Sequence, residues 1–167
     1  MAQAKSDAQQ PQSATLPEQM PNPEGRQEDC LQITYHPQGL MNLRTSGDVS
    51  KIMSRHFGTA LPQGANRFSV SGDRRALWLG PDESLLMCAD QDAAELHRTL
   101  STQLTDKHFQ LTLLSDALAV YELNGPYVRE ILAKGCALDL HVSVFRPGQC
   151  AQSNLERASV TLMCEAG

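Results

Sequence analysis

The chain has 167 residues, of which 41% are hydrophobic, and its formal net charge is −5 at pH 7. This length suits one compact domain with a tail. The acidic balance excludes a nucleic-acid binder that holds phosphates on a basic face. The sequence contains no run of about 18 uncharged apolar residues, so no membrane-spanning helix is predicted.

The first part of the chain differs in composition from the rest. Residues 1–29 are rich in Gln and Pro and contain almost no aliphatic residue beyond Leu16. Such a segment cannot bury enough apolar surface to offset the entropy lost on ordering. We therefore expect a disordered arm over residues 1–29 and a folded domain over residues 30–167. The arm's composition is typical of a solvated leader, and less so of a docking arm for a partner subunit.

The cysteines and the start of the chain indicate the cellular compartment in which the protein is expected. The opening segment MAQAKSDAQQPQ has one Lys and no apolar core, unlike a secretory signal. Reduced thiols in the cytoplasm are therefore expected. The five cysteines are scattered and form no CxxC pair: Cys30, Cys88, Cys136, Cys150 and Cys164.

The folded pattern begins at Leu31. Residues 31–35 alternate apolar and polar side chains, which predicts a half-buried strand, and residues 41–44 form a second extended piece. A helix is expected over residues 49–57, with Asp48 as its N-cap and Gly58 in the left-handed position that ends it.

A hairpin follows. Residues 75–79 and 84–88 are continuously apolar and flank Gly80-Pro-Asp-Glu83, whose proline presets the turn. Continuous apolar strands usually have both faces covered. Asp90 is then expected to cap a helix whose apolar face has helical spacing. That face consists of Ala93, Leu96, Leu100 and Leu104.

The second half of the chain predicts another hairpin, a helix and a final pair of strands. Residues 109–113 and 117–123 form the expected hairpin, joined by a turn at Ser115-Asp116. Residues 150–155 and 159–164 form the final pair. The expected fold class is α+β, an antiparallel sheet with about three helices.

The helix of this half follows Asn124-Gly125. Pro126 is expected at its first position, and Gly135 is expected to stop it. Its apolar residues share one face: Val128, Ile131 and Leu132. Its charged residues are expected to point away: Arg129, Glu130 and Lys134.

The sequence shows no grouping of residues that is typical of a catalytic, phosphate-binding or metal-binding site. None of the histidines is paired as HxH or HExxH, and no phosphate-binding loop is present. Cys88 and Cys164 are expected to be inert core thiols, and Cys136 follows the unfavourable end of a helix dipole. We therefore predict no catalytic, cofactor-binding or metal-ligating residue in this chain. The histidines considered are His36, His56, His97, His108 and His141.

For several other polar groups, both a functional and a structural role remain open from the sequence. The joint Asn124-Gly125-Pro126 could bind an anion, but a tight strand-to-helix joint is favoured because proline lacks a donor. Arg74-Arg75 could hold an acidic partner, although a solvated charge run is the preferred interpretation. The remaining carboxylates have no second group at a defined spacing for acid–base work. They are Asp82, Glu83, Asp106 and Asp116.

Three blocks carry a family resemblance. They are residues 73–83 (DRRALWLGPDE), 123–141 (LNGPYVREILAKGCALDLH) and 145–152 (FRPGQCAQ), and residues 41–44 (MNLR) fit as well. Together they resemble the gamma subunit of heterotetrameric sarcosine oxidase, over about residues 31–164. The long middle block is specific, whereas the Gly-Pro-Asp-Glu turn alone is shared with related folate-binding domains.

The resemblance implies a fold like part of the aminomethyltransferase folate-binding domain. It implies a complex with alpha, beta and delta subunits, with no nucleic acid and no membrane as partners. Such a complex oxidises sarcosine to glycine, and the methyl carbon leaves as formaldehyde or is captured by tetrahydrofolate. FAD, FMN, NAD, tetrahydrofolate and zinc are expected on partner subunits. No catalytic residue is carried over to this chain.

The resemblance also raises two alternatives and one departure. The chain could be a free-standing folate-binding or one-carbon-transfer protein, or the same subunit in a complex that oxidises another N-methyl or secondary amine. Family members usually continue past the strand near Cys164 with another strand and a terminal helix. Here Glu165-Ala-Gly167 follows, so a C-terminal truncation or an exposed sheet edge is expected.

Overall fold

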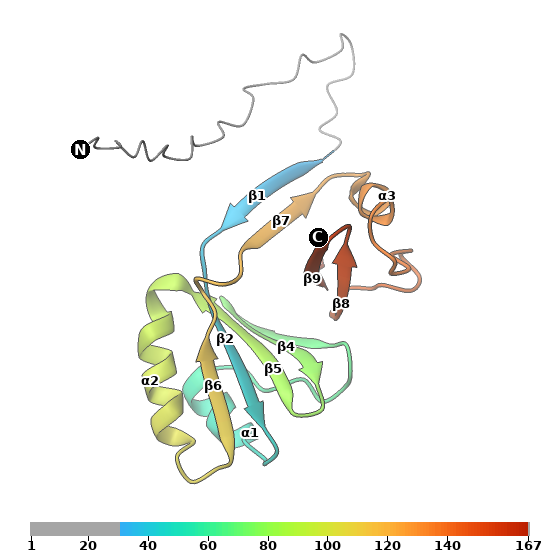
Figure 1. Ribbon diagram of the computed structural model, residues 1–167. Coiled ribbons are helices and arrows are strands. Elements are labelled where there is room, and N and C mark those ends of the chain that lie inside the picture. The colour runs from blue at the N-terminus through green and yellow to red at the C-terminus, as the bar shows by residue number, and fades with distance from the viewer. Residues whose placement is uncertain (1–30, 167) are drawn as a thin grey trace, which may run out of the picture.

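The computed structural model describes residues 31–166, and the arm predicted over residues 1–29 lies outside them. A five-stranded antiparallel sheet forms the centre, in the order β3-β4-β5-β2-β6, which confirms the predicted α+β class (Figure 1). Its strands are β2 (Gln38–Thr45), β3 (Phe68–Ser71), β4 (Arg74–Gly80), β5 (Glu83–Ala89) and β6 (Phe109–Leu113). Of these, β3 was not expected from the sequence.

Helices cover one face of this sheet. The short α1 (Ser50–Ile52) runs into a π-helical turn, η1 (Met53–Phe57), and a 3-10 turn, η2 (Asp90–Asp92), leads into α2 (Ala93–Gln103). Full burial of each large apolar side chain contributes about 1.5–3 kcal/mol. The expected apolar face of α2 is confirmed in this core, which contains Met41, Leu43, Met53, Phe57, Leu86, Ala93, Leu96, Leu100 and Leu104.

The helix starts differ from the sequence prediction, whereas the end at Gly58 agrees with it, at φ +90°. The N-cap of α1 is Val49, one residue after the predicted Asp48, although Asp48 Oδ1 accepts the N–H of Ser50 at 2.9 Å. The prediction that Asp90 caps the next helix is wrong, because its side chain makes no capping hydrogen bond to η2 or α2. The chain enters α2 through η2 instead.

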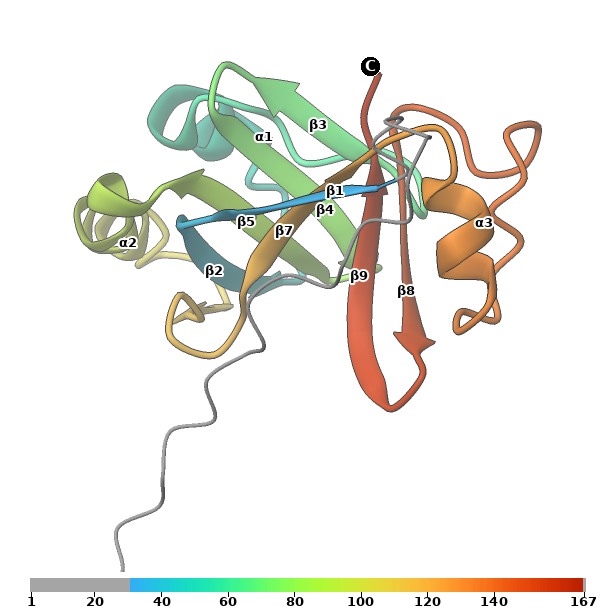
Figure 2. The same ribbon diagram turned by 90° about the horizontal axis from the view of Figure 1, so that it is seen from above.

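A separate hairpin covers part of the other face of the sheet. β8 (Gln149–Leu155) pairs with β9 (Ala158–Cys164), as predicted. Figure 2, seen from above, shows the sheet between the helices α1 and α2 on one side and this hairpin on the other. The runs of β4 and β5 are therefore covered on both faces, as expected. The second core contains Leu40, Leu77, Leu85, Met87 and Cys150, with Val120 and Met163 packed against it.

The predicted hairpin of residues 109–113 with 117–123 is wrong. β6 pairs with β2, and β7 (Val120–Asn124) pairs with β1 (Gln32–His36) in a separate two-stranded ribbon. Figure 1 shows this ribbon continuing from the β2–β6 edge of the sheet. β6 lies where the sequence predicted it and β7 begins at Val120 rather than at residue 117, but each strand pairs with a partner from far away in the sequence.

A bend between the sheet and the ribbon explains this pairing. Pro37 interrupts the first segment, since it has no N–H to donate. Opposite it, Leu118 N–H donates to Leu114 O at 3.0 Å, so this segment turns as well. Two bonds hold the bend: Leu114 N–H donates to Leu40 O at 2.8 Å, and Leu40 N–H donates to Ser115 Oγ at 3.1 Å. The two segments therefore stay side by side through the bend.

Arg129 does not point away from the fold, which corrects the prediction for α3 (Val128–Ala133). Its Nη1 donates to Leu140 O at 2.5 Å and to Phe145 O at 2.9 Å, and its Nη2 lies 3.3 Å from Cys164 Sγ. Arg129 therefore ties α3 to the loop after it and to β9, because it satisfies carbonyl groups of an irregular segment.

The start of α3 differs from the prediction, whereas its end agrees with the stop predicted at Gly135. The helix begins at Val128, so Pro126 precedes it instead of taking its first position. It ends close to Gly135, where a Cβ would meet Glu156 Oε1 at 3.0 Å. Glu156 N–H donates to Gly135 O at 2.8 Å. Gly135 thus permits a close approach of α3 to the β8–β9 turn.

Gly39 marks the closest approach between the sheet and α2. A Cβ at this position would lie 2.6 Å from Ala93 Cβ and 2.8 Å from Cys88 Sγ. We predict that Gly39→Ala lowers the free energy of unfolding by about 1–3 kcal/mol through overpacking. Urea denaturation checks this, with Gly47→Ala as the control because no atom lies within 4 Å of its added methyl. Equal midpoints for the two variants would contradict the prediction.

Arg129→Met is expected to lower the free energy of unfolding by about 2 kcal/mol or more, because buried carbonyl groups lose charged donors. The matched control is Lys134→Met on the same helix, since Lys134 is exposed and makes no side-chain hydrogen bond or ion pair within residues 31–166. Thermal unfolding followed by circular dichroism measures both. A control that falls as far as Arg129→Met would rule out the proposed role.

Candidate functional site

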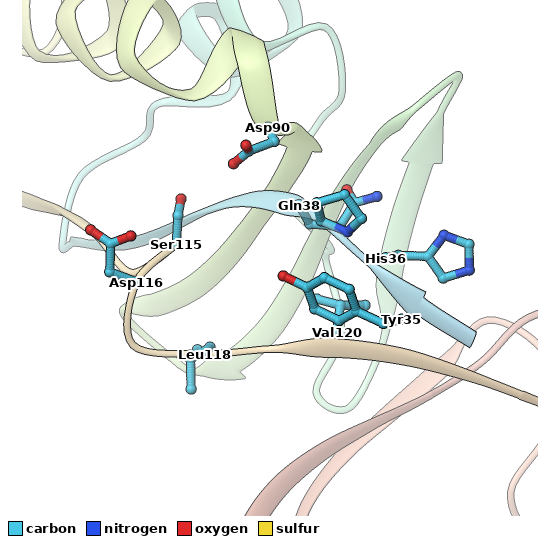
Figure 3. A pocket seen from close by; sticks show the side chains of 9 residues that line it. Tyr35, His36, Gln38, Asp90, Ser115, Asp116, Leu118 and Val120 are labelled. Carbon is cyan, nitrogen blue, oxygen red and sulfur yellow. The ribbon is translucent and has the colours of Figure 1, made fainter. Parts of the chain in front are cut away.

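A polar hollow of about 160 Å³ lies at the bend between the sheet and the ribbon. Three parts of the chain build it: the end of β1, the start of η2 and the turn before β7. Figure 3 shows the Asp90 carboxylate and the Ser115 hydroxyl on one side of the hollow and the Tyr35 hydroxyl on another. The bend that separates β1 from β2 is therefore what creates the site.

The hollow is rich in hydrogen-bond acceptors. Asp90 and Asp116 line it, and neither carboxylate pairs with a basic side chain in the part of the chain that the structure describes. Gln38 also lines it, and its Oε1 is buried without a hydrogen-bond partner among the described residues. An unpaired buried oxygen costs free energy unless a donor reaches it. The two carboxylates give the hollow an acidic character, whereas the Gln38 oxygen is out of reach of a group in the hollow.

One residue that lines the hollow, His36, already interacts with a neighbouring carboxylate. His36 Nε2 lies 2.7 Å from Glu122 Oε2 on the neighbouring strand of the ribbon. Hydrogen bonds from the Asn124 amide and from His36 lower the pKa of the Glu122 carboxyl. His36 is therefore turned toward Glu122 and is not available as a base in the hollow.

The size and chemistry of the hollow limit what it can do. Pockets for drug-sized ligands occupy about 300–1,000 Å³, so this hollow is too small to enclose a folate. The hollow holds carboxylates, hydroxyls and an amide, and none of its residues forms a nucleophile–base pair. A single ammonium or guanidinium group matches its size and its acceptors.

A second hollow, of about 330 Å³, lies beside α1. Its polar lining consists of Asp48, Lys51 and Lys107. Asp48 already accepts the N–H of Ser50, and that bond and the Ser50 hydroxyl lower the pKa of its carboxyl. This hollow offers no convergent set of groups for chemistry.

The ribbon exposes an apolar face, which corrects the prediction of a half-buried strand over residues 31–35. The alternation is present, but Ile33, Tyr35 and Tyr121 are 59%, 58% and 56% exposed. Tyr35 and Tyr121 are directly opposite in the pairing, and their ring centroids lie 5.6 Å apart. The other face of the ribbon carries the His36–Glu122 pair. Apolar groups therefore face solvent on the side away from that pair.

The two neighbouring arginines are structural, so neither of the earlier interpretations holds. Arg74 Nη1 donates to Phe57 O at 2.6 Å, and its guanidinium lies over the Phe57 ring. Arg75 forms a bidentate pair with Glu165, and this bond raises the pKa of the Arg75 guanidinium. The two side chains fasten η1 and the segment after β9 to the sheet.

The remaining sequence candidates are distributed over the fold. Asp82 lies 3.5 Å from Arg44, and Glu83 accepts a hydrogen bond from the Asn42 amide. Within residues 31–166, no group of three or more His, Cys, Asp or Glu side chains is arranged to hold a metal ion. Over the same range, no helix combines the length and apolar content needed to cross a membrane. The absence of catalytic and cofactor-binding residues stays a prediction.

The described cysteines are free thiols with different surroundings. Cys88 is fully buried, and its burial raises the pKa of the thiol to about 11. Burial also raises the pKa of Cys150. The predicted core position is therefore confirmed for Cys88. It is wrong for Cys164, which is only half-buried and lies beside the Arg129 guanidinium, while the inertness of both thiols stays a prediction.

These surroundings predict the order of alkylation. A thiol with a pKa near 11 is ionised to about one part in a thousand at about pH 8, and the thiolate is the reactive form. With iodoacetamide, we expect Cys164 to be modified before Cys88 and Cys150 in the folded protein. Mass spectrometry of tryptic peptides measures the rates, and labelling in urea is the control. Equal rates for Cys88 and Cys164 in the native protein would contradict the assignment.

Comparisons with known proteins agree with this architecture. A family model described as "Sarcosine oxidase, gamma subunit family" matches residues 47–165. Sarcosine oxidase subunit gamma from Corynebacterium sp. (strain P-1) is 38% identical over 112 residues, which are 66% of this chain and 54% of the relative. The Arthrobacter sp. protein of the same name is 33% identical over 107 residues, 64% of this chain and 52% of the relative. The chain thus spans about half the length of these curated relatives.

Solved structures show the same fold. A chain of heterotetrameric sarcosine oxidase from Corynebacterium sp. U-96, in complex with pyrrole 2-carboxylate, superposes with a TM-score of 0.73 at 27% identity. The match covers 83% of this chain and 72% of that chain. Aminomethyltransferase T of the glycine cleavage system from Bartonella henselae has a TM-score of 0.53 at 14% identity, over 72% of this chain and 35% of that one, and shows the fold alone. With the family model matched over most of the folded residues, this chain belongs to the sarcosine oxidase gamma subunit family.

Proposed function

We propose that this chain is a non-catalytic structural subunit of a heterotetrameric sarcosine oxidase. Its partners are alpha, beta and delta subunits in the cytoplasm. FAD, FMN, NAD, tetrahydrofolate and zinc are bound by those partners. The complex oxidises sarcosine with oxygen and water to glycine, hydrogen peroxide and formaldehyde, or passes the methyl carbon to tetrahydrofolate as 5,10-methylenetetrahydrofolate.

The observation that carries this proposal is the exposed apolar face of the ribbon. Ile33, Tyr35 and Tyr121 are each more than half exposed and lie on one face. Aromatic residues are enriched at protein interfaces, and an isolated two-stranded ribbon is marginally stable in water. A subunit that packs this face against a larger chain both covers the apolar side chains and supports the ribbon.

The site chemistry supports the same proposal. The polar hollow has no nucleophile–base pair and is too small to enclose a folate. A free-standing folate-binding or one-carbon-transfer protein would need a larger cavity with several convergent polar groups. The amine that the complex oxidises is determined by a pocket on another chain, so sarcosine and related secondary amines are separated only by assay of the complex.

Co-purification tests the proposal. The tagged chain is expressed in its native host, and the proteins that co-purify with it are identified by mass spectrometry. We expect one complex that contains this chain, shows flavin absorbance and oxidises sarcosine, whereas the isolated chain oxidises nothing. Dimethylglycine and proline are assayed in parallel, and calorimetry of the isolated chain with tetrahydrofolate is expected to show no heat. Absence of a flavin-containing partner, or turnover by the isolated chain, would refute the proposal.

A further inference from the structure

We propose that Asn124 is a site of spontaneous modification, at which attack by the backbone nitrogen of Gly125 converts the side-chain amide to a carboxylate. This inference goes beyond the proposed function and does not depend on it. It concerns the joint at the end of β7, where the strand leads toward α3 (Figure 1).

The residue after Asn124 is suited to ring closure. An asparagine side chain can form a cyclic imide with the nitrogen of the next residue, and a side chain on that residue crowds the attack. Among the asparagines of the sequence, Asn124 alone is followed by glycine. Gly125 has no Cβ, and its φ of +132° lies in a region that other residues rarely adopt. Little steric hindrance therefore opposes attack on the Asn124 amide.

The position of the joint leaves the attacking nitrogen free. Asn124 is the last residue of β7 and pairs with Gln32, the first residue of β1. Gly125 lies outside this pairing, and its N–H makes no backbone hydrogen bond within residues 31–166. Asn124 is exposed, so water reaches its amide. Because the ends of strands open more readily than their centres, the joint has the freedom that ring closure requires.

The other asparagines that the structure describes lack this combination. Asn42 lies in β2, which is paired on both sides, and its amide donates to Glu83 at 2.8 Å. Asn66 and Asn154 are exposed, but a residue with a long side chain follows each of them. They are therefore internal controls for the effect of the glycine.

The reaction needs no partner other than water. Hydroxide removes the proton of the Gly125 N–H, the nitrogen bonds to Asn124 Cγ, and Nδ2 takes up a proton and leaves as ammonia. Water then opens the cyclic imide at either of its two carbonyl carbons. One opening gives an aspartyl residue, and the other gives an isoaspartyl residue, in which the peptide bond runs through Cγ. Nothing is oxidised or reduced, since an amide and water become a carboxylate and ammonium.

This change reverses an interaction on the polar face of the ribbon. Asn124 Nδ2 donates to Glu122 Oε1 at 2.7 Å, and Glu122 Oε2 lies 2.7 Å from His36 Nε2. A carboxylate at position 124 cannot donate, and its charge repels that of Glu122. The hydrogen bond from Asn124 is the largest cause of the lowered pKa of Glu122, so this pKa rises when the amide is lost. Because a two-stranded ribbon is marginally stable, the modified ribbon is expected to open more readily.

Ageing of the full chain tests the modification. The folded chain is kept warm at mildly alkaline pH and digested with trypsin at intervals. The peptide of residues 108–129 contains Asn124 as its only asparagine, so mass spectrometry follows its conversion, and chromatography separates the isoaspartyl form. We expect Asn124 to be converted at least about tenfold faster than Asn154, because the glycine leaves ring closure unhindered. Circular dichroism verifies that the chain stays folded.

Two results would overturn the proposal. One is an equal rate of conversion at Asn124 and Asn154. The other is conversion of Asn124 in urea but not in the folded chain, since the fold would then protect the amide. The variant Asn124→Gln is the matched control, because its longer side chain closes the ring poorly, and its peptide is expected to keep its mass.

A second experiment measures the effect on the ribbon. Asn124→Asp reproduces the charge of the product, and Asn154→Asp places the same charge on β8. Hydrogen exchange at residues 32–36 is expected to become faster in Asn124→Asp and to stay unchanged in Asn154→Asp. In a Glu122→Gln background the like charge is absent, so Asn124→Asp is expected to cause little further change. Equal exchange in Asn124→Asp and the wild-type chain would contradict the weakening of the ribbon.

Discussion

The fold depends on one long-range pairing, in which residues 32–45 run antiparallel to residues 109–124 through a bend. On one side of the bend β2 and β6 extend the central sheet, and on the other β1 and β7 form the ribbon. The bonds of Leu40 with Leu114 and Ser115 hold the bend. Because Pro37 cannot donate and residues 114–118 turn, the pairing continues in a new direction without a break in the path of either segment.

This bend brings two surface features of the molecule to one place. It removes the ribbon from the cover of the helices and the β8–β9 hairpin, so Ile33, Tyr35 and Tyr121 face solvent. It also opens the hollow between the end of β1 and η2, where Asp90 and the orphaned amide of Gln38 lie. The exposed apolar face and the acidic hollow therefore lie next to each other, as the proposed role of a partner-binding subunit requires.

The rest of the molecule is a scaffold that holds this surface in place. Two cores on opposite faces of the sheet contribute most of the burial, and Gly39 lets α2 approach β2 closely. Three arginines stabilise the irregular parts of the fold. Arg74 donates a hydrogen bond to η1, Arg75 binds Glu165, and Arg129 donates to the loop after α3. Each of these guanidinium groups satisfies carbonyl or carboxylate oxygens that secondary structure leaves without a partner.

The sequence by itself determined where most strands and helices lie, since apolar periodicity, Asp48 and Gly58 act over a few residues. The sequence also contains no recognisable catalytic motif among residues that lie close together in the chain. It could not determine that residues 120–124 pair with residues 32–36, that Arg129 turns inward, or that Asp90, Asp116 and Gln38 line one hollow. Those facts depend on contacts between residues far apart in the chain, and their free energy comes from packing and hydrogen bonds that exist only after the sheet has formed.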